Sequence, residues 1–188
     1  MKQARAEGWR SRAVFKLQEI DRKHRLIRPG MLVLDLGAAP GAWSQYVRTQ
    51  VGRKGRVVAS DILPMDALAG VDFVQGDFRE AEVLAAIRER LGGNSADLVL
   101  SDMAPNLAGI DAVDQPRAMY LAELAIELAA EVLKPGGSAL IKVFQGAGFQ
   151  ELTTLARQKF AAVRFLKPEA SRARSPETYL LATGRRMV

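Results

Sequence analysis

"MLVLDLGAAPGAW", residues 31–43, joins an apolar run to a glycine-containing turn and the start of a helix. The run follows a helix-stop signal, "RPG", and is ended by Gly37, which predicts a buried strand over 31–37. Gly37 and Gly41 allow backbone to pass close to a ligand. The stretch therefore predicts a strand, a ligand-binding loop and a helix in immediate succession.

Six further apolar segments extend this pattern along the chain. They predict strands at 56–62, 71–77, 97–103, 138–144, 161–167 and 178–184, with helical periodicity between many of them. Continuously apolar strands separated by helices indicate an α/β fold, with a mostly parallel seven-stranded sheet covered by helices on both faces. We expect a single domain over residues 1–188.

Two helical segments carry apolar stripes. The longer lies within 114–137, where Pro116 suits the first turn and Gly136 follows the end, and its stripe consists of Leu121, Leu124, Ala125, Leu128 and Val132. The basic N-terminal segment, 1–28, has a shorter stripe of Ala13, Leu17 and Ile20. This stripe predicts that the segment packs on the body of the domain.

Composition excludes several kinds of chemistry. The 188 residues include no cysteine and one histidine, His24, which excludes thiol catalysis, disulfides and zinc sites built from Cys or His. Carboxylates could hold magnesium, but no spacing calls for it, so no metal is expected. No apolar run approaches the roughly 20 residues of a membrane helix. No secretory signal is evident, so a cytoplasmic location is expected.

Charge is distributed unevenly along the chain. Residues 1–28 hold nine Lys/Arg against three Asp/Glu, and 157–188 hold eight against two. The stretch 29–156 holds ten against sixteen, so each end is +6 and the middle is −6. Two basic ends on an acidic body favour a polyanionic partner such as nucleic acid, the alternative being that basic termini only aid solubility.

The loop and the strand ends indicate the kind of cofactor. The loop lacks G-x-G-x-x-G, because Ala39 occupies the second glycine position, and no Gly-Lys-Ser/Thr follows it. Asp61 lies about 20 residues beyond the loop, where a carboxylate commonly holds ribose hydroxyls. Together with Asp35, Asp77 and Asp102 it places acidic groups at successive strand ends. An adenosine cofactor without phosphates, S-adenosylmethionine, fits this pattern.

Lys142 is unusual within "SALIKVFQG" (138–146), since a lysine there has five apolar neighbours. Burying a charge is costly unless the charge is paired or neutralised. A lysine on an edge strand could also extend to solvent. Lys142 is thus a candidate for an amine with a role in the functional site.

The chain resembles the FtsJ family of ribosomal RNA 2′-O-ribose methyltransferases, and within it the bacterial members that modify a uridine of 23S rRNA. The resemblance runs from about residue 8 to the end and rests on these stretches: "SRAVFKLQEID", "DLGAAPGAWSQ", "GVDFVQGDF", "SDMAPN", "PRAMYL", "PGGSALIKVFQG" and "SRARSPETYLLATGR". It implies a Rossmann-like class I methyltransferase fold. It also implies S-adenosylmethionine as cofactor and a ribose 2′-hydroxyl as methyl acceptor.

The resemblance also implies site residues. A catalytic tetrad maps onto Lys16, Asp102, Lys142 and Glu177. Asp61 would hold the ribose hydroxyls, Asp77 and Phe78 would lie at the adenine, and Asp102 would lie near the methionyl amine and the methyl group. The full set of expected cofactor-binding residues is Gly37, Pro40, Gly41, Trp43, Asp61, Asp77, Phe78 and Asp102.

The tetrad suggests a mechanism. Lys142 would act as the base or orient the 2′-oxygen, while Asp102 and Lys16 position the hydroxyl and Glu177 organises both lysines. Only a neutral amine accepts a proton. Apolar neighbours and Lys16 favour that form, whereas the two carboxylates favour the ammonium, and the sequence does not decide between them. The run Ala104-Pro105-Asn106 lacks the aromatic residue typical of base-amino methyltransferases, which favours ribose oxygen.

Ribosomal RNA on the large subunit is the expected partner. The candidate RNA clamp comprises Arg5, Arg10, Arg12, Arg172 and Arg174, and a 2′-hydroxyl acceptor excludes DNA. A monomer without membrane association is expected. The family pattern differs at Ala42, usually glycine, and in a basic arm that relatives usually carry before Gly8, which concerns RNA affinity rather than chemistry. The alternatives are a non-catalytic RNA-binding or ribosome-assembly factor, a 2′-O-methyltransferase of tRNA or mRNA caps and, more distantly, a nicotinamide dehydrogenase.

Overall fold

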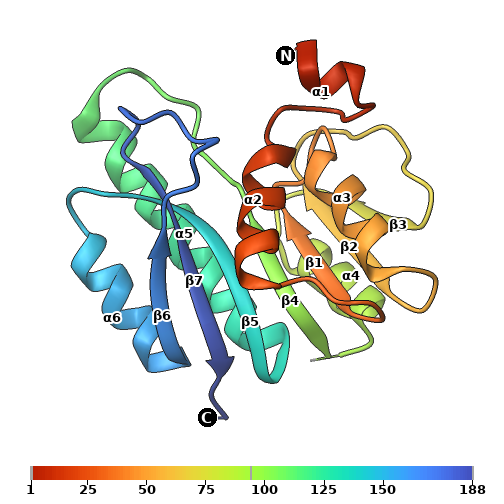
Figure 1. Cartoon of the computed structure of the whole chain (residues 1–188). Helices are drawn as coiled ribbons and strands as arrows, with labels where there is room; N and C mark the ends of the chain where they lie inside the picture. Colours follow the sequence, from red (N-terminus) through yellow and green to blue (C-terminus); the bar gives the residue numbers. More distant parts are fainter. Residues whose placement is uncertain (1, 94, 188) are drawn as a thin grey trace.

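A twisted seven-stranded sheet forms the centre of the molecule in the computed structural model, which describes residues 2–93 and 95–187 (Figure 1). The strand order is β3-β2-β1-β4-β5-β7-β6. All neighbouring strands are parallel except β7, which pairs antiparallel with β5 and β6. The strands are β1 (Leu32–Leu36), β2 (Arg56–Asp61), β3 (Val71–Gln75), β4 (Ala96–Ser101), β5 (Leu133–Phe144), β6 (Phe160–Leu166) and β7 (Glu177–Arg185).

This architecture confirms the predicted α/β fold, and all seven predicted strand segments form strands. The chain order reverses between β1 and β4, and Leu36 lies level with Ser60 of β2 and Ser101 of β4. Ligands of such sheets bind beyond the carboxyl ends of the strands at this reversal. The acidic strand ends therefore meet at one edge.

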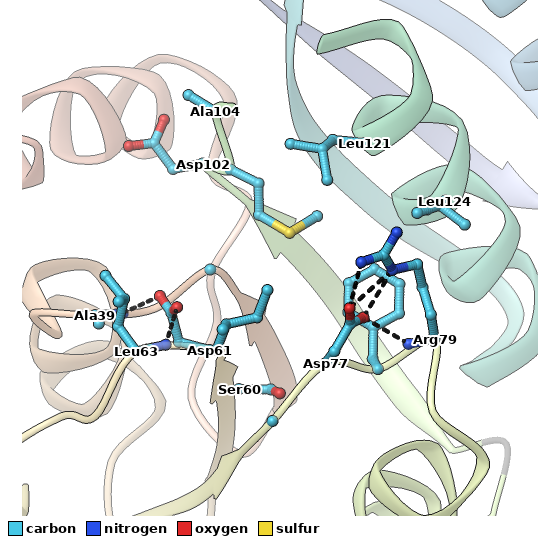
Figure 2. Close-up of a pocket in the computed structure, with 15 residues that line it drawn as sticks. Ala39, Ser60, Asp61, Leu63, Asp77, Arg79, Asp102, Ala104, Leu121 and Leu124 are labelled. Atoms are coloured by element: carbon cyan, nitrogen blue, oxygen red, sulfur yellow. Dashed lines mark hydrogen bonds and ion pairs between the residues drawn. The ribbon is translucent and has the colours of Figure 1, made fainter. Parts of the chain in front are cut away.

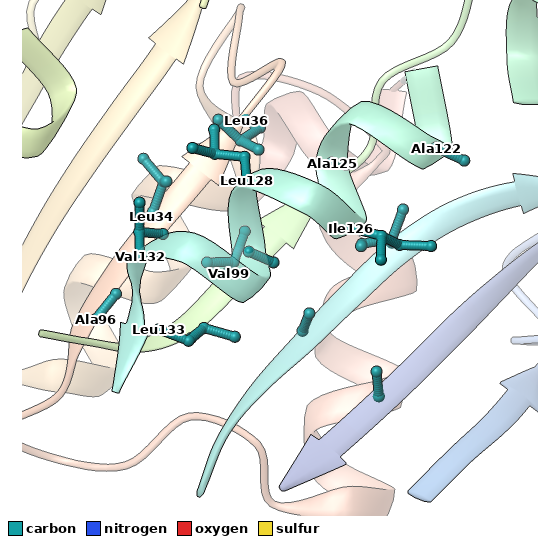
Figure 3. Close-up of a cluster of buried hydrophobic side chains, with 14 of the residues drawn as sticks. Leu34, Leu36, Ala96, Val99, Ala122, Ala125, Ile126, Leu128, Val132 and Leu133 are labelled. Carbon is teal, nitrogen blue, oxygen red and sulfur yellow. The ribbon is translucent and has the colours of Figure 1, made fainter. Parts of the chain in front are cut away.

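Helices cover both faces of the sheet. They are α1 (Lys2–Ala6), α2 (Val14–His24), α3 (Ala42–Val51), α4 (Ala81–Leu91), α5 (Asp111–Val132) and α6 (Phe149–Lys159). One face buries residues of α4, α5 and α6 in the larger apolar cluster, where α5 packs on the sheet (Figure 3). The other face buries residues of α2 and α3 in a second cluster. Among the described residues, none of the helices is long and apolar enough to cross a bilayer.

The N-terminal segment packs as its stripe predicts. Leu17 and Ile20 are buried in the second cluster together with Trp43. The indole Nε1 of Trp43 donates a 2.8 Å hydrogen bond to the carbonyl of Ala13, and its ring lies against that of Tyr179. These contacts fix α2 beside the carboxyl end of β5 and the amino end of β7.

Helix α5 differs from its prediction in two ways. It begins at Asp111 rather than near Pro116, because the buried carboxylate of Asp114 accepts backbone N–H groups of the preceding loop. Leu121 and Leu124 are only partly buried and line a cavity, whereas the helix packs through the remaining stripe residues and smaller neighbours. The stripe therefore faces the cavity at Leu121 and Leu124 and the core at its other three residues.

Candidate active site

A cavity of about 320 Å³ lies beyond the carboxyl ends of β1, β2 and β4 (Figure 2). The loops after these strands form one side, and Leu121 and Leu124 of α5 form the other. Five of the residues predicted to bind cofactor line it: Gly37, Asp61, Asp77, Phe78 and Asp102. Sequence reasoning missed Ser60, Met103, Leu121 and Leu124, although Met103 lies within the quoted "SDMAPN" stretch.

Asp61 organises the near end of this cavity. One carboxylate oxygen accepts the N–H of Ala39 in the glycine loop at 2.9 Å, and the other accepts the N–H of Leu63 at 2.9 Å. Gly37 has a positive φ of 70°, and an added Cβ would lie 2.4 Å from the Met103 side chain. The loop can therefore run close beneath a ligand whose hydroxyls face Asp61.

Asp77 organises the far end. Arg79 binds its carboxylate through both side-chain and backbone N–H groups, and its guanidinium lies 5.9 Å from the ring centre of Tyr120. The hydrogen bond from Arg79 lowers the pKa of Asp77 below its ordinary value. The pair holds Asp77 and Phe78 as a wall of the cavity.

The cavity suits a phosphate-free adenosine compound. The hydroxyl of Ser60 is buried and has no hydrogen-bond partner in the part of the chain that the structure describes. A buried hydroxyl without a partner is costly, and a ligand atom would satisfy it. The lining joins apolar side chains to the carboxylate of Asp61, while Arg79 is paired with Asp77. Nothing in that donor set selects phosphate.

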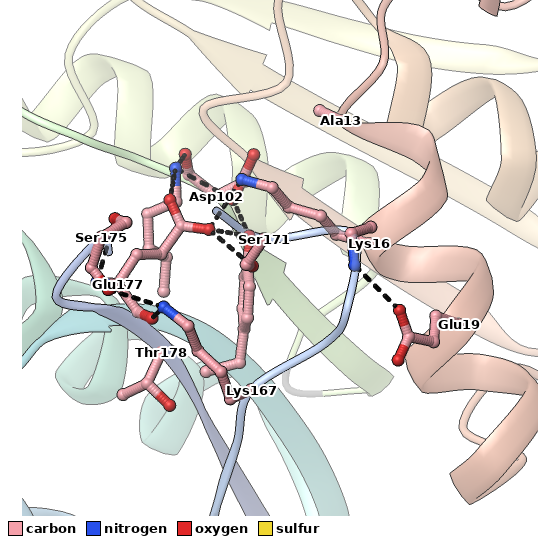
Figure 4. A network of polar contacts seen from close by, with 12 residues as sticks. Ala13, Lys16, Glu19, Asp102, Lys167, Ser171, Ser175, Glu177 and Thr178 are labelled. Carbon is pink, nitrogen blue, oxygen red and sulfur yellow. Dashed lines mark hydrogen bonds and ion pairs between the residues drawn. The ribbon is translucent and has the colours of Figure 1, made fainter. Parts of the chain in front are cut away.

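The four predicted tetrad residues meet beside this cavity (Figure 4). The Nζ atom of Lys142 lies 3.2 Å from Oδ1 of Asp102 and 3.5 Å from Oε2 of Glu177. The Nζ atom of Lys16, from α2, lies 2.6 Å from Oε1 of Glu177. Residues 161 positions apart in sequence are thus joined in one hydrogen-bonded network.

Two further residues belong to this network, Tyr179 and Ser171. The Tyr179 hydroxyl donates to Oδ1 of Asp102 at 2.6 Å, and the Ser171 hydroxyl donates to Oε1 of Glu177 at 3.1 Å. Tyr179 follows Glu177 by two residues and so points to the same face of β7. Both residues lie in the stretch "SRARSPETYLLATGR", but nothing in the sequence alone marks them as polar partners.

The network fixes the charge of its buried groups. Burial raises the pKa of Glu177, but the hydrogen bond from Lys16 and the positive charge of Lys142 outweigh burial, and the pKa lies below its usual value. Burial and the adjacent Asp102 carboxylate raise the pKa of Tyr179 far above that of a free phenol. At neutral pH, Glu177 is therefore a carboxylate and Tyr179 a neutral hydrogen-bond donor.

The loop before β7 is tied down on both sides. The carboxylate of Glu19, on α2, accepts the N–H groups of Glu169 and Ala170. Lys167 donates to the carbonyls of Ser175 and Glu177. The loop therefore holds Ser171 and Arg172 close to the tetrad.

Asp35 forms a buried carboxyl beneath the glycine loop. It is 1% exposed and accepts a 2.6 Å hydrogen bond from the hydroxyl of Ser44. Burial raises its pKa from 3.8 to about 7, and the negative charges of Asp102 and Asp61 add to the rise while Ser44 opposes it. The sequence presented Asp35 as one acidic strand end among four, yet it lies inside β1 rather than in the main cavity.

Asp35 predicts a pH dependence of stability. Between about pH 4 and pH 7 the folded protein keeps a proton on Asp35 that the unfolded chain releases, so the free energy of unfolding falls as pH rises. Between pH 5 and pH 7.5 we expect Asp35→Asn to remove roughly 2–3 kcal/mol of this fall. Urea unfolding of both proteins at pH 5 and pH 7.5 measures it. Equal pH dependence in the two proteins would contradict the assignment.

The five arginines of the predicted RNA clamp lie at different places in the structure. Arg12 and Arg172 line a groove of about 310 Å³ with Lys16, Ser175 and Glu177, which we call the basic groove. Arg5 is exposed on α1 and Arg174 is exposed in the loop before β7, and neither lines the groove. Arg10 lies elsewhere: its guanidinium donates to the carbonyls of Pro40, Asp66 and Ala67 at 2.8–3.0 Å.

These contacts predict a positioning role for Arg10 at the glycine loop. It joins the glycine loop, through Pro40, to the segment after β2. We expect Arg10→Ala to weaken cofactor binding roughly tenfold, since about three charged hydrogen bonds that order these loops are lost. Isothermal titration with S-adenosylmethionine measures this. Arg5→Ala is the matched control, and equal affinity of the two variants would contradict the role.

The remaining predicted residues are close to the cavity but outside its lining. Pro40 and Trp43 border a small hollow between the glycine loop, Ser11 and Asp102. Gly41 has a φ of 110° and adjoins Arg10 and Met65. Trp43 is 3% exposed, so its ring belongs mainly to the core. Within residues 2–93 and 95–187, no cluster of three or more His, Cys, Asp or Glu residues could hold a metal ion.

Comparisons with known proteins agree with this geometry. Residues 9–185 match the family model described as FtsJ-like methyltransferase. A Plasmodium falciparum protein, provisionally described as a ribosomal RNA methyltransferase, is 26% identical, with a TM-score of 0.82 over 94% of this chain and 98% of its own. A provisionally described rRNA methylase of Clostridium thermocellum is 17% identical, with a TM-score of 0.61 over 90% and 97% of the two chains. Aeropyrum pernix fibrillarin, solved with S-adenosylmethionine, is 14% identical, with a TM-score of 0.65 over 93% and 75%.

The fold and the cavity define a methyltransferase of the S-adenosylmethionine-dependent kind, and the cofactor expected from the sequence agrees with this fold. More specifically, the chain belongs to the FtsJ-like methyltransferase family.

Proposed function

We propose that the protein methylates the ribose 2′-hydroxyl of a uridine in large-subunit ribosomal RNA, with the assembled subunit in the cytoplasm as its substrate. The observation that carries the proposal is the hydrogen-bonded Lys16–Glu177–Lys142–Asp102 network at the edge of the cofactor cavity. An amine held between two carboxylates is positioned to bind a hydroxyl, and in its neutral form it can take the hydroxyl proton. The cavity beside it suits a methyl donor.

Different residues of the cavity would bind different parts of S-adenosylmethionine. Asp61 would accept hydrogen bonds from the ribose hydroxyls, and Asp77 and Phe78 would contact the adenine. Asp102 would lie next to the methionyl end. Bound there, the cofactor supplies a methyl group on a sulfonium, which is already activated for transfer and leaves a neutral thioether.

The tetrad would then act on the acceptor hydroxyl. Lys142 would orient the 2′-oxygen or, as a neutral amine, take its proton as the new oxygen–carbon bond forms, while Asp102 and Lys16 would position the hydroxyl. Glu177, held as a carboxylate by Lys16, keeps both amines in place. Alignment of reacting atoms at about 3–3.5 Å supplies much of the acceleration in such a transfer.

RNA fits the groove next to the tetrad. The basic groove brings Arg12, Lys16 and Arg172 together from the two basic ends of the chain. Phosphate contacts of this kind supply affinity without sequence information. The Plasmodium falciparum neighbour, with its provisional description as a ribosomal RNA methyltransferase, supports the same class of substrate.

A substrate comparison tests the proposal. Unmodified large ribosomal subunits, protein-free rRNA from the same subunits and bulk tRNA are each incubated with enzyme and labelled S-adenosylmethionine. We expect the fastest incorporation into the large subunit and little into tRNA. Preferred labelling of tRNA, or no labelling of any RNA, would contradict the proposal.

Reversing charge in the basic groove tests how RNA is held. We expect Arg12→Glu combined with Arg172→Glu to weaken RNA binding at least roughly tenfold and to reduce the salt slope by about two. Affinity for S-adenosylmethionine should not change, because neither residue lines the cofactor cavity. Filter binding over a salt series measures the RNA affinity. Arg53→Glu combined with Arg157→Glu is the control. Equal RNA affinities of the two double variants would refute the groove model.

A further inference from the structure

A second large cavity lies on the other side of the tetrad from the cofactor. Its volume is about 690 Å³, within the range of small-molecule sites. We call it the loop pocket. It is bordered by Leu107, Gly109 and the first turns of α5, by 144–147 after β5, and by Ser175 and Pro176 before β7.

The walls of the loop pocket are held in place by hydrogen bonds. The Asp114 carboxylate accepts N–H groups of Ala108, Gly109 and Ile110, which fixes the first wall. The Gln115 side chain donates to the carbonyls of Phe144 and Ala147, and the N–H of Gln145 donates to the Pro176 carbonyl at 3.0 Å. Three segments distant in sequence thus form the walls of one preformed site.

The lining is unsuited to phosphate. It contains the carboxylates of Asp111 and Asp114 and no lysine or arginine. Leu107, Phe144 and Pro176 supply apolar surface, and Leu107 is 69% exposed. Apolar walls with a few amide and carboxylate groups match a nucleobase, which has flat apolar faces and polar edges.

The position of the loop pocket relative to the tetrad indicates which nucleotide's base would enter the pocket. Phe144 lies opposite Glu177 in the β5–β7 register and two residues beyond Lys142, and Pro176 precedes Glu177 directly. Ser175 lines both the loop pocket and the basic groove. A nucleotide whose ribose contacts Lys142 can therefore place its phosphate in the basic groove and its base in the loop pocket.

We propose that the loop pocket receives the unpaired nucleobase of the very nucleotide that is methylated. The inference rests on the proposed function, since the ribose must lie at the tetrad. It adds that the base must leave its helix or stack, because the pocket lies between loops that a duplex cannot enter. Base recognition would then come from one contiguous site rather than from the basic ends of the chain.

Filling the pocket tests the inference. Ala112 and Ala147 are exposed and line it from opposite walls, so Ala112→Trp and Ala147→Trp occupy it without disturbing the core. We expect kcat/KM for RNA to fall roughly 10- to 100-fold in each variant, with unchanged affinity for S-adenosylmethionine. Ala85→Trp, on an exposed position of α4, is the control and should retain parental activity.

A cross-linking measurement on the parental enzyme complements the variants. Large-subunit rRNA containing 4-thiouridine is irradiated with the enzyme, and the peptides attached to the methylated nucleotide are mapped. Attachment to 107–118, 144–147 or 175–176 supports the inference. Parental kcat/KM in both tryptophan variants, or attachment elsewhere only, overturns the loop pocket. Absence of methyl transfer by the parental enzyme overturns the proposed function instead.

Discussion

Lys142→Met abolishes methyl transfer without abolishing cofactor binding: this is the largest effect we expect. The substitution keeps much of the side chain's length and removes the amine that lies between Asp102 and Glu177. Loss of a group that positions and deprotonates the acceptor reduces turnover roughly 10²–10⁴-fold. Single-turnover transfer to RNA measures the loss. Lys54→Met, at an exposed turn position, should behave as the parental protein.

The pH profile separates the two roles open to Lys142. If its neutral amine takes the proton, the single-turnover rate rises with pH in the parental enzyme and this rise disappears in Lys142→Met. If it only orients the oxygen, both profiles lack that rise. Near-parental turnover by Lys142→Met with normal RNA binding would exclude both roles.

Asp61→Ala is the substitution with the largest expected effect on cofactor affinity. The Asp61 carboxylate orders the glycine loop through Ala39 and the segment after β2 through Leu63, and it faces the cavity. Losing it removes the predicted bonds to the ribose hydroxyls and loosens both loops. Hydrogen bonds to charged groups are worth about 1.5–3 kcal/mol, so affinity should fall roughly 10- to 100-fold or more.

Calorimetric titration with S-adenosylmethionine measures this change, and thermal unfolding checks that the fold survives. Asp72→Ala is the matched control, because Asp72 is an exposed aspartate on neighbouring β3. If Asp61→Ala kept the parental dissociation constant, the proposal that this cavity binds the cofactor through Asp61 would be contradicted.

The strands could be predicted from the sequence more completely than the contacts of individual side chains at the surface and at the cavity. Apolar runs identified all seven strands, most directly the central strands β1 and β4, because burial on both faces leaves little freedom in residue type. The cavity at Leu121 and Leu124 could not be predicted, because periodicity records which residues share a face and not whether a cavity or a strand lies opposite that face. The N-terminus of α5 was misplaced because its start depends on how Asp114 binds the loop before it.

Some residues of the site could be predicted from the sequence and others could not. Lys142 could be singled out because a charge in an apolar strand is anomalous, and the resemblance supplied its partners. Tyr179 and Ser171 could not, since an aromatic residue in a strand and a serine in a loop are ordinary in any sequence. The contacts of Arg10 could not be predicted either, because net charge does not reveal that a guanidinium is engaged by three backbone carbonyls.

The position of the transferred methyl group tests the central claim most directly. Large-subunit RNA methylated by the parental enzyme with labelled S-adenosylmethionine is digested to nucleosides and analysed by mass spectrometry. The proposed function predicts that the label resides on a ribose, as 2′-O-methyluridine. Label on a base, or on no nucleoside at all, would contradict the account.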